Sequence, residues 1–233
     1  MKPLTAIHSS KFPMLKTAVT RGAALFGMAG FVSTAMGDTV IDTILGWNGS
    51  ASVSAFGLPN TATYGQTVTV PLSDPYLSSF TFEFNLPASN TFKGYVFAWD
   101  GTKAAGPSLY ASPTMSTAGT GFQAVTFNTG LFSLTPGGVY VLFASTAAIP
   151  TSTGTGNWGQ PSNTNPYAGG EFVYLNNGTD PTQWTTVSWT KNYLATGGDL
   201  AFRANFATVP EPASLGLLLF GAGALTLTRR RVS

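Results

Sequence analysis

Carboxylates are the side chains between residues 38 and 208 whose chemistry would allow acid–base catalysis. That span contains two glutamates, Glu83 and Glu171, and a glycoside hydrolase needs two facing carboxylates. In the strand pattern described below, Glu83 lies on the polar face of one strand and Glu171 opens another, so the two could meet on an outer sheet face. Solvent exposure of both is the simpler interpretation. We therefore expect that the protein is not an enzyme and has no catalytic residues. The alternative is a secreted polysaccharide hydrolase that uses Asp and Glu carboxylates.

The same span lacks the other common catalytic and metal-binding groups. The chain has one histidine, His8, and no cysteine. A Ser-His-Asp triad, a Cys-His pair, a thiolate zinc site and an imidazole metal site each need one of these two residue types. Those classes of site are excluded for residues 38–208, and the fold there must be stabilised without disulfides.

Three aspartates, Asp100, Asp180 and Asp199, lie at predicted turns. Aspartate at a turn commonly accepts hydrogen bonds from its own backbone. A structural calcium ion held by these carboxylates and by loop carbonyls is the alternative, although the sequence contains no Asp-x-Asp-x-Asp-Gly loop. We expect no metal site and no cofactor.

Four aromatic residues are candidates for a ligand platform. Residues 150–169 form a long stretch of small polar residues that contains Trp158 and Tyr167, and loops on a rigid scaffold often carry binding sites. The Trp158 indole could stack on a sugar ring, and Trp184 and Trp189 could extend the platform. The alternative is that these aromatics fold back and fill the edge of the core.

The elements that must position these residues are strands. Phe80, Phe82 and Phe84 alternate with polar residues, which predicts a half-buried antiparallel strand. A second aromatic strand, 94–99, stops at the turn dipeptide Asp100-Gly101. The same period of two predicts further strands over 66–70, 121–128, 139–145, 170–175, 183–189 and 200–206.

About eight short strands and no helix between residues 38 and 208 predict an all-β fold. Two packed antiparallel sheets, an antiparallel β-sandwich of jelly-roll type, are the expected architecture.

The span contains four Lys and Arg against eight Asp and Glu, a net charge of −4. Because it has no basic stripe, we expect no binding to nucleic acid.

The N-terminal residues predict a signal peptide over 1–37. An apolar stretch, 22–32, is followed by the small residues Ala35-Met36-Gly37 of a signal peptidase site. Four basic residues precede that stretch: Lys2, Lys11, Lys16 and Arg21. Cleavage would leave Asp38 as the first mature residue, and an uncleaved amphipathic or membrane helix is the alternative.

The C-terminal residues combine three features in order. Pro210-Glu211-Pro212 is followed by an uncharged apolar run, 213–228, and then by the basic cluster Arg229-Arg230-Arg231. The order predicts a single transmembrane helix whose arginines stay on the cytoplasmic side. The run has 16 residues, whereas a bilayer core asks for about 20. The run is therefore short for a permanent membrane anchor and better suited to a segment that is removed.

Residues 209–233 resemble the PEP-CTERM sorting signal of Gram-negative bacteria, and Val209-Pro210-Glu211-Pro212 matches a common form of its motif. The resemblance implies an inner-membrane-anchored precursor that an exosortase, an integral-membrane protease, cleaves before the protein reaches the cell surface or the extracellular matrix. The strand pattern of residues 38–208 is also similar to the β-sandwich ectodomains often found before such signals. We therefore expect an exported, non-enzymatic surface or matrix protein, with extracellular polysaccharide as the ligand class that the aromatic loop would suit.

Overall fold

The computed structural model describes residues 38–117, 119–161, 165–191 and 198–208. The predicted signal peptide, the transmembrane helix and the sorting residues from Val209 onward lie outside these ranges and stay predictions. Across the described ranges the chain forms twelve strands and one four-residue helix, so the all-β fold with two antiparallel sheets is confirmed. Within them, no helix has the length and hydropathy needed to cross a bilayer.

The first sheet is built around β4 (Tyr76–Asn85). One side of β4 pairs with β7 (Gln123–Ser133), and the other side pairs first with β12 (Phe202–Ala207) and then with β9 (Gly156–Gly159). The outer strands are β1 (Thr39–Asp42), which pairs with β12, and β2 (Ser52–Phe56), which pairs with β9.

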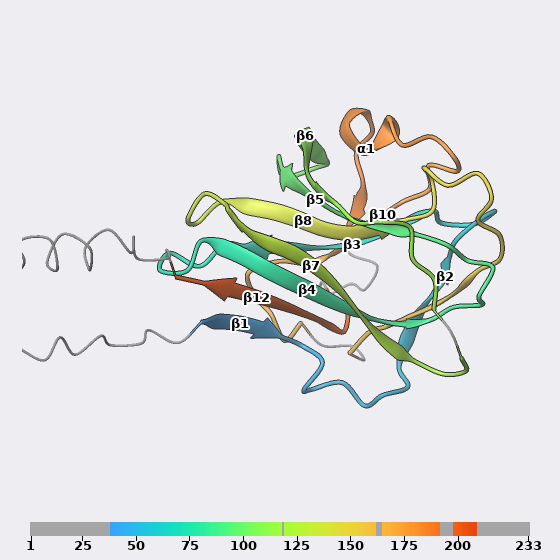
Figure 1. The fold of residues 1–233 in the computed structure, drawn as a ribbon, viewed down its shortest axis with the longest axis horizontal. Helices are drawn as coiled ribbons and strands as arrows, with labels where there is room; N and C mark the ends of the chain where they lie inside the picture. The colour runs from blue at the N-terminus through green and yellow to red at the C-terminus, as the bar shows by residue number, and fades with distance from the viewer. Residues whose placement is uncertain (1–37, 118, 162–164, 192–197, 209–233) are drawn as a thin grey trace, which may run out of the picture. The chain divides into compact units, whose positions relative to one another are not determined.

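The second sheet has the strand order β11-β10-β3-β8-β5-β6. Every pairing between named strands in both sheets is antiparallel, and Figure 1 shows the sheets lying one over the other. The strands of the second sheet are β3 (Thr63–Thr69), β5 (Lys93–Trp99), β6 (Ala104–Ala111), β8 (Val139–Ser145), β10 (Phe172–Leu175) and β11 (Thr190–Lys191). The jelly-roll assignment stays a prediction.

The main core lies between the two sheets and is dominated by aromatic rings. The predicted alternation on β4 is confirmed, because Phe80, Phe82 and Phe84 are all fully buried. The two sheets approach each other so closely at Gly94 of β5 that a Cβ there would overlap the Phe127 ring of β7. Glycine is therefore required at this crossing for steric reasons.

A second apolar cluster covers the outer face of the second sheet. Trp184 packs on Tyr95 and Phe143, with ring centroids 4.7 and 5.2 Å apart, and Trp189 also packs on Phe143 at 5.2 Å. Trp184 belongs to α1 (Gln183–Thr186), so the strand predicted over 183–189 is wrong. The turn starts where Asp180 Oδ1 accepts hydrogen bonds from the backbone and hydroxyl of Thr182, which commits the chain to a helical turn instead of a strand.

The sequence pattern does not predict five of the strands, which are β1, β2, β6, β9 and β11. They are short or consist largely of small residues, so their hydrophobic alternation is weak. The predicted turns are better defined. Asp100 Oδ1 accepts hydrogen bonds from the backbones of Thr102 and Lys103 between β5 and β6, and Gly137 has a φ of +72° between β7 and β8.

Candidate functional site

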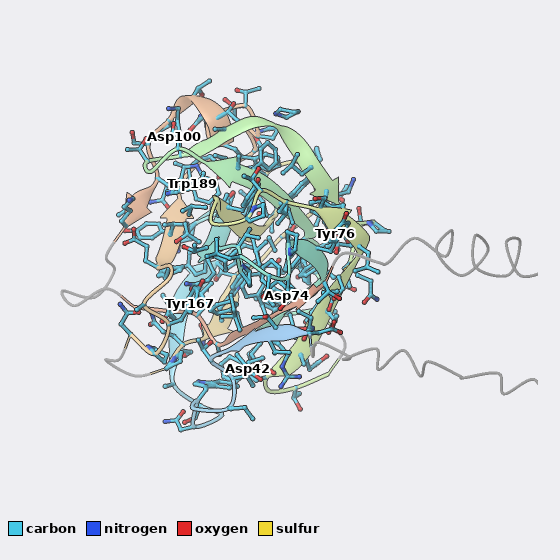
Figure 2. The ribbon with its side chains drawn as sticks, turned by 90° about the vertical axis from the view of Figure 1, so that its left-hand side faces the viewer. Asp42, Asp74, Tyr76, Asp100, Tyr167 and Trp189 are labelled. Atoms are coloured by element: carbon cyan, nitrogen blue, oxygen red, sulfur yellow. The ribbon has the colours of Figure 1, made fainter. Side chains whose placement is uncertain are left out.

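The two ends of the described β ectodomain lie side by side. In the β1–β12 ladder, Thr39 is opposite Phe206 and Asp42 is opposite Arg203. The Arg203 guanidinium donates to Asp42 Oδ2 through Nε at 2.7 Å, and its NH2 nitrogen lies 2.7 Å from the same oxygen. Thr39 also donates a hydrogen bond to Asp74, and Figure 2 looks onto the end where Asp74 and Tyr76 lie. The chain therefore enters and leaves the first sheet on neighbouring strands.

The Trp158 side chain is not exposed. It belongs to β9 and is 0% exposed, with its ring centroid 4.3 Å from that of Phe84 and 4.8 Å from that of Phe82. The stretch that was expected to be a loop pairs with β2 and β4 and turns its indole into the core. The predicted platform is therefore wrong for Trp158, and the alternative, filling of the core, describes it.

The other three platform residues are also engaged inside the fold. Trp184 and Trp189 are buried, and their indole nitrogens donate to Thr63 Oγ1 at 3.1 Å and to the Trp184 carbonyl at 2.9 Å. Tyr167, labelled with Trp189 in Figure 2, is half-buried, and its hydroxyl accepts a hydrogen bond from the Thr69 backbone at 3.0 Å. These residues do not form an exposed platform, because Trp184 and Trp189 are buried against Phe143 of the second sheet and Tyr167 packs on Phe202 of the first sheet.

The two candidate catalytic glutamates belong to different sheets. Glu83 lies on β4, where partial burial raises the pKa of its carboxyl and the nearby Arg203 charge opposes that rise. Glu171 directly precedes β10, and its Oε1 lies 3.1 Å from Lys191 Nζ. Glu171 is thus ion-paired with Lys191, whereas the Arg203 near Glu83 is ion-paired with Asp42.

The three turn aspartates each have their own hydrogen-bond donors. Asp100 binds Thr102 and Lys103, and Asp180 binds Thr182 and Gln183, as expected for carboxylates that cap turns. Among the described residues there is no group of three or more His, Cys, Asp or Glu side chains that could hold a metal ion.

Asp199 is fully buried and ties the segment before β10 to the core strands. Its Oδ1 accepts from Gln66 Nε2 at 2.7 Å and its Oδ2 from the Tyr167 backbone at 2.8 Å. With its side-chain amide oriented so that the nitrogen faces acceptors, Asn165 donates a hydrogen bond to the same Oδ2 at 2.9 Å. Burial raises the pKa of Asp199 to about 6, against the opposing effect of the Tyr167 and Gln66 hydrogen bonds.

A pair of half-buried aromatics on the outer face of the first sheet was missed by the sequence analysis. Trp47 and Phe122 pack edge to face with ring centroids 4.9 Å apart, and Trp47 Nε1 donates to the Ala51 carbonyl at 2.7 Å. A Cβ on Gly159 would lie 3.0 Å from both Trp47 Cζ2 and Glu83 Cβ, so the indole lies beside Glu83. No sequence signal predicts this pairing, because the two aromatics are 75 positions apart and no local pattern connects them.

This polar and aromatic surface, which we call the Trp47 face, has the chemistry of a ligand site. It consists of Trp47, Phe122, Glu83, Arg203 and Asp42. The indole and phenyl rings offer apolar surface, while the carboxylates and the guanidinium offer acceptors and donors. Such a combination suits a ligand with apolar ring faces and hydroxyl edges.

Residues 208–232 match the family model described as the PEP-CTERM protein-sorting motif. The chain carries a PEP-CTERM sorting motif. The resemblance inferred from Pro210-Glu211-Pro212 is therefore confirmed, and the roles of the individual residues, including the Arg229-Arg230-Arg231 cluster, stay predictions. No curated protein sequence matches the chain.

The chain is similar to parts of two solved clostridial structures. One comprises the cysteine protease and lectin-like domains of Cwp84, a surface layer associated protein of Clostridium difficile, at 14% identity and a TM-score of 0.42 over 64% of this chain. The other is a variant of clostridial cysteine protease Cwp84 after propeptide cleavage, at 16% identity and a TM-score of 0.44 over 68% of this chain. The matched regions cover 32% and 38% of those chains, about a third of their length.

A PEP-CTERM motif implies an exported, membrane-anchored precursor in a Gram-negative bacterium that an exosortase processes. The motif match begins at residue 208, directly after β12 ends at Ala207. β12 is hydrogen-bonded to β1 on one side and to β4 on the other. The PEP-CTERM motif is thus joined to an interior strand of the folded ectodomain without a long linker.

Proposed function

We propose that this protein is a non-enzymatic cell-surface or extracellular-matrix protein whose β ectodomain is detached from the membrane when an exosortase cleaves after β12. The observation that carries the proposal is the position of the PEP-CTERM motif one residue beyond Ala207. Phe202, Ala204 and Phe206 of β12 are buried in the core, so the strand is held by packing on one face and by pairing with β1 and β4 along its two edges. Cleavage beyond residue 208 leaves those contacts intact.

Replacement of Pro210-Glu211-Pro212 by three alanines tests the processing step. In a host that has an exosortase, we expect the variant to accumulate as a membrane-retained precursor, while Lys103→Ala, on the exposed β5–β6 turn, is processed normally. Intact-mass analysis of the surface or secreted form measures the outcome. A wild-type surface form that still contains Arg229 to Arg231 would contradict the proposal.

Polysaccharide binding at the Trp47 face is the finer part of the proposal. Trp47 and Phe122 supply ring surface for stacking on a sugar, and Glu83 and Arg203 lie beside them to bind hydroxyl groups. Stacking on an aromatic ring contributes about 1 to 3 kcal/mol per contact, by analogy with base stacking. The separation of Glu83 and Glu171 onto two sheets supports binding over hydrolysis.

A glycan-array screen of the purified ectodomain, followed by variants, tests this part. We expect Trp47→Ala to weaken the binding of the best glycan by about five-fold to a hundred-fold. Trp99→Ala is the matched control, because Trp99 is a half-buried tryptophan on the second sheet. Equal losses in both variants would place the site elsewhere. Release of new reducing ends from the bound glycan would favour the hydrolase alternative.

A further inference from the structure

Exposed apolar side chains gather at the end of the ectodomain where β1 begins and β12 ends. Leu72 is 81% exposed, Leu131 is 46% exposed and Val139 is 38% exposed. Leu72 lies in the segment between β3 and β4, while Leu131 and Val139 lie on either side of the turn between β7 and β8. We call these three residues and the two turns that carry them the apolar end.

Backbone contacts place these turns together and next to both chain ends. Gly137 donates to the Val70 carbonyl at 2.9 Å, and Leu134 donates to the Pro75 carbonyl at 2.8 Å. In the first sheet, Tyr76 is paired with Ala207, the last residue of β12. Figure 1 shows the β3–β4 and β7–β8 connections, the arrowhead of β12 and the start of β1 at the same end.

The composition of the apolar end suits contact with a nonpolar or interfacial environment. The segments 71–75 and 134–138 contain one charged residue, Asp74, and that side chain is buried. Leu131 has a φ of +61°, a conformation that costs free energy for any residue except glycine, and its side chain still faces outward. Transfer of these side chains into an interface would therefore require almost no desolvation of charge.

The sequence between β12 and the apolar C-terminal run is short. Four residues, 209–212, separate Thr208 from Ala213, where the predicted transmembrane run begins, and two of them are prolines. The five Cα-to-Cα steps from Thr208 to Ala213 span at most about 17 Å when the chain is fully extended. As long as residues 213–228 are in the bilayer, the end of β12 and the turns beside it are held at the membrane surface.

We propose that, in the anchored precursor, the apolar end docks on the membrane and places Leu72, Leu131 and Val139 in the lipid headgroup region. The proposal rests on the proposed function, because the sorting signal must first anchor the chain. Docking would hold Pro210-Glu211-Pro212 at the membrane surface, where an integral-membrane protease acts. It buries apolar side chains that the free ectodomain leaves in water.

Single-cysteine labelling of the full-length precursor tests the docking, since the chain has no native cysteine. Leu72→Cys is labelled with an environment-sensitive fluorophore and reconstituted into phosphatidylethanolamine–phosphatidylglycerol vesicles that contain nitroxide-labelled lipid. Leu45→Cys is the matched control, because Leu45 is an equally exposed leucine on the loop beyond β1, at 83%. Ala88→Cys, in the exposed β4–β5 turn at the other end of β4, is the second control.

We expect the label at position 72 to shift its emission to the blue and to be quenched by the nitroxide lipid, and the labels at 45 and 88 to do neither. Flotation of the vesicles measures anchoring separately. A precursor that floats but shows the same unquenched emission at all three positions would overturn the docking and leave the proposed function standing. A precursor that does not float would overturn both. Quenching that occurs only when exosortase is added would mean that the apolar end contacts the protease, and it would overturn the proposal of docking on lipid.

Discussion

Thr39, the first residue of β1, lies directly opposite Phe206 of β12 in an antiparallel ladder. The predicted signal peptidase site and the PEP-CTERM motif therefore flank two strands that pair with each other. β1 has only four residues and is an edge strand, so its four ladder positions alone would hold it weakly. Side-chain contacts beyond the ladder, including the Asp42–Arg203 ion pair and the buried hydroxyl of Thr43, reinforce the pairing.

Thr43→Val should weaken the attachment of β1. The Thr43 hydroxyl donates to the Leu200 carbonyl at 2.6 Å and accepts from the Phe202 backbone at 2.8 Å, and the side chain is buried. The substitution keeps the shape and leaves both backbone groups unpaired, which we expect to cost about 1 to 3 kcal/mol of unfolding free energy. Thr43→Ser retains the hydroxyl and should cost clearly less. Urea denaturation of the ectodomain measures both, and equal losses would contradict the role of the hydroxyl.

Trp158→Ala should destabilise the ectodomain by about 3 to 5 kcal/mol, as expected for truncation of a large buried aromatic. The indole contacts four aromatic rings, including Phe56 at 5.0 Å and Tyr64 at 5.6 Å. Trp158→Phe should cost less, partly because Trp158 Nε1 has no hydrogen-bond partner among the described residues. Thermal unfolding checks the order of the two variants. A Trp158→Ala variant as stable as wild type would mean that the indole lies outside the core in solution.

Gly94→Ala tests the close approach of the two sheets. The new methyl group would overlap the ring of Phe127, which is itself buried and has no room to withdraw. Overpacking of this kind costs about 1 to 3 kcal/mol. The double variant Gly94→Ala/Phe127→Leu should be more stable than the sum of the two single effects predicts, because the smaller side chain relieves the overlap. Strict additivity in a double-mutant cycle would show that the two residues do not meet.

The raised pKa of Asp199 predicts that the stability of the ectodomain depends on pH. Burial raises the pKa of this carboxyl from 3.8 to about 6 in the folded state. The folded state therefore binds the Asp199 proton more tightly than the unfolded state does. The contribution of this proton to the unfolding free energy is fully present below about pH 4 and is lost as the pH rises through about 6. The difference between the two pKa values corresponds to about 3 kcal/mol, which the Asn165 hydrogen bond to the charged carboxylate reduces to about 1 to 2 kcal/mol.

We therefore expect the unfolding free energy to be larger at pH 5 than at pH 7, and Asp199→Asn to remove most of that difference, the remainder coming from Glu83, whose pKa is also raised by burial. Asp180→Asn is the control, because hydrogen bonds from Thr182 lower the pKa of Asp180 and place its effect at more acidic pH. Denaturant titrations at the two pH values give the comparison. Wild-type stability that rises from pH 5 to pH 7 would be evidence against a raised pKa at Asp199.

The strands with aromatic alternation could be predicted because their pattern is local. Phe80, Phe82 and Phe84 repeat every second residue, and any sheet that buries one of them buries all three. In the segment 183–189, which was expected to be a strand, Trp184 and Trp189 are five positions apart and would lie on opposite faces of a strand. The hydrogen bond from Thr182 to Asp180 precedes a helical turn there, α1. Asp180 accepts hydrogen bonds from Thr182 as expected for a turn aspartate, but its position in the sequence does not say that a helical turn follows it.

The Trp47 face and the position of Trp158 could not be predicted in the same way. Trp158 lies among glycine, asparagine and threonine, which is typical of a loop, yet β9 pairs with residues of β2 more than a hundred positions earlier. The Trp47–Phe122 contact likewise joins a loop after β1 to the start of β7. Pairings at such separations depend on the order of strands in the sheet, and no local periodicity records that order.

The sequence by itself determined the PEP-CTERM motif, the lack of histidine and cysteine chemistry between residues 38 and 208, and the all-β class. Each of these depends on residue identity or on a period of two, and both can be read without knowing which segments meet. Only the tertiary structure decided that Trp158 fills the core, that Glu83 and Glu171 belong to different sheets and that Thr39 lies beside Phe206. These are long-range contacts, and they exist because burying both faces of the aromatic strands brings distant parts of the chain together.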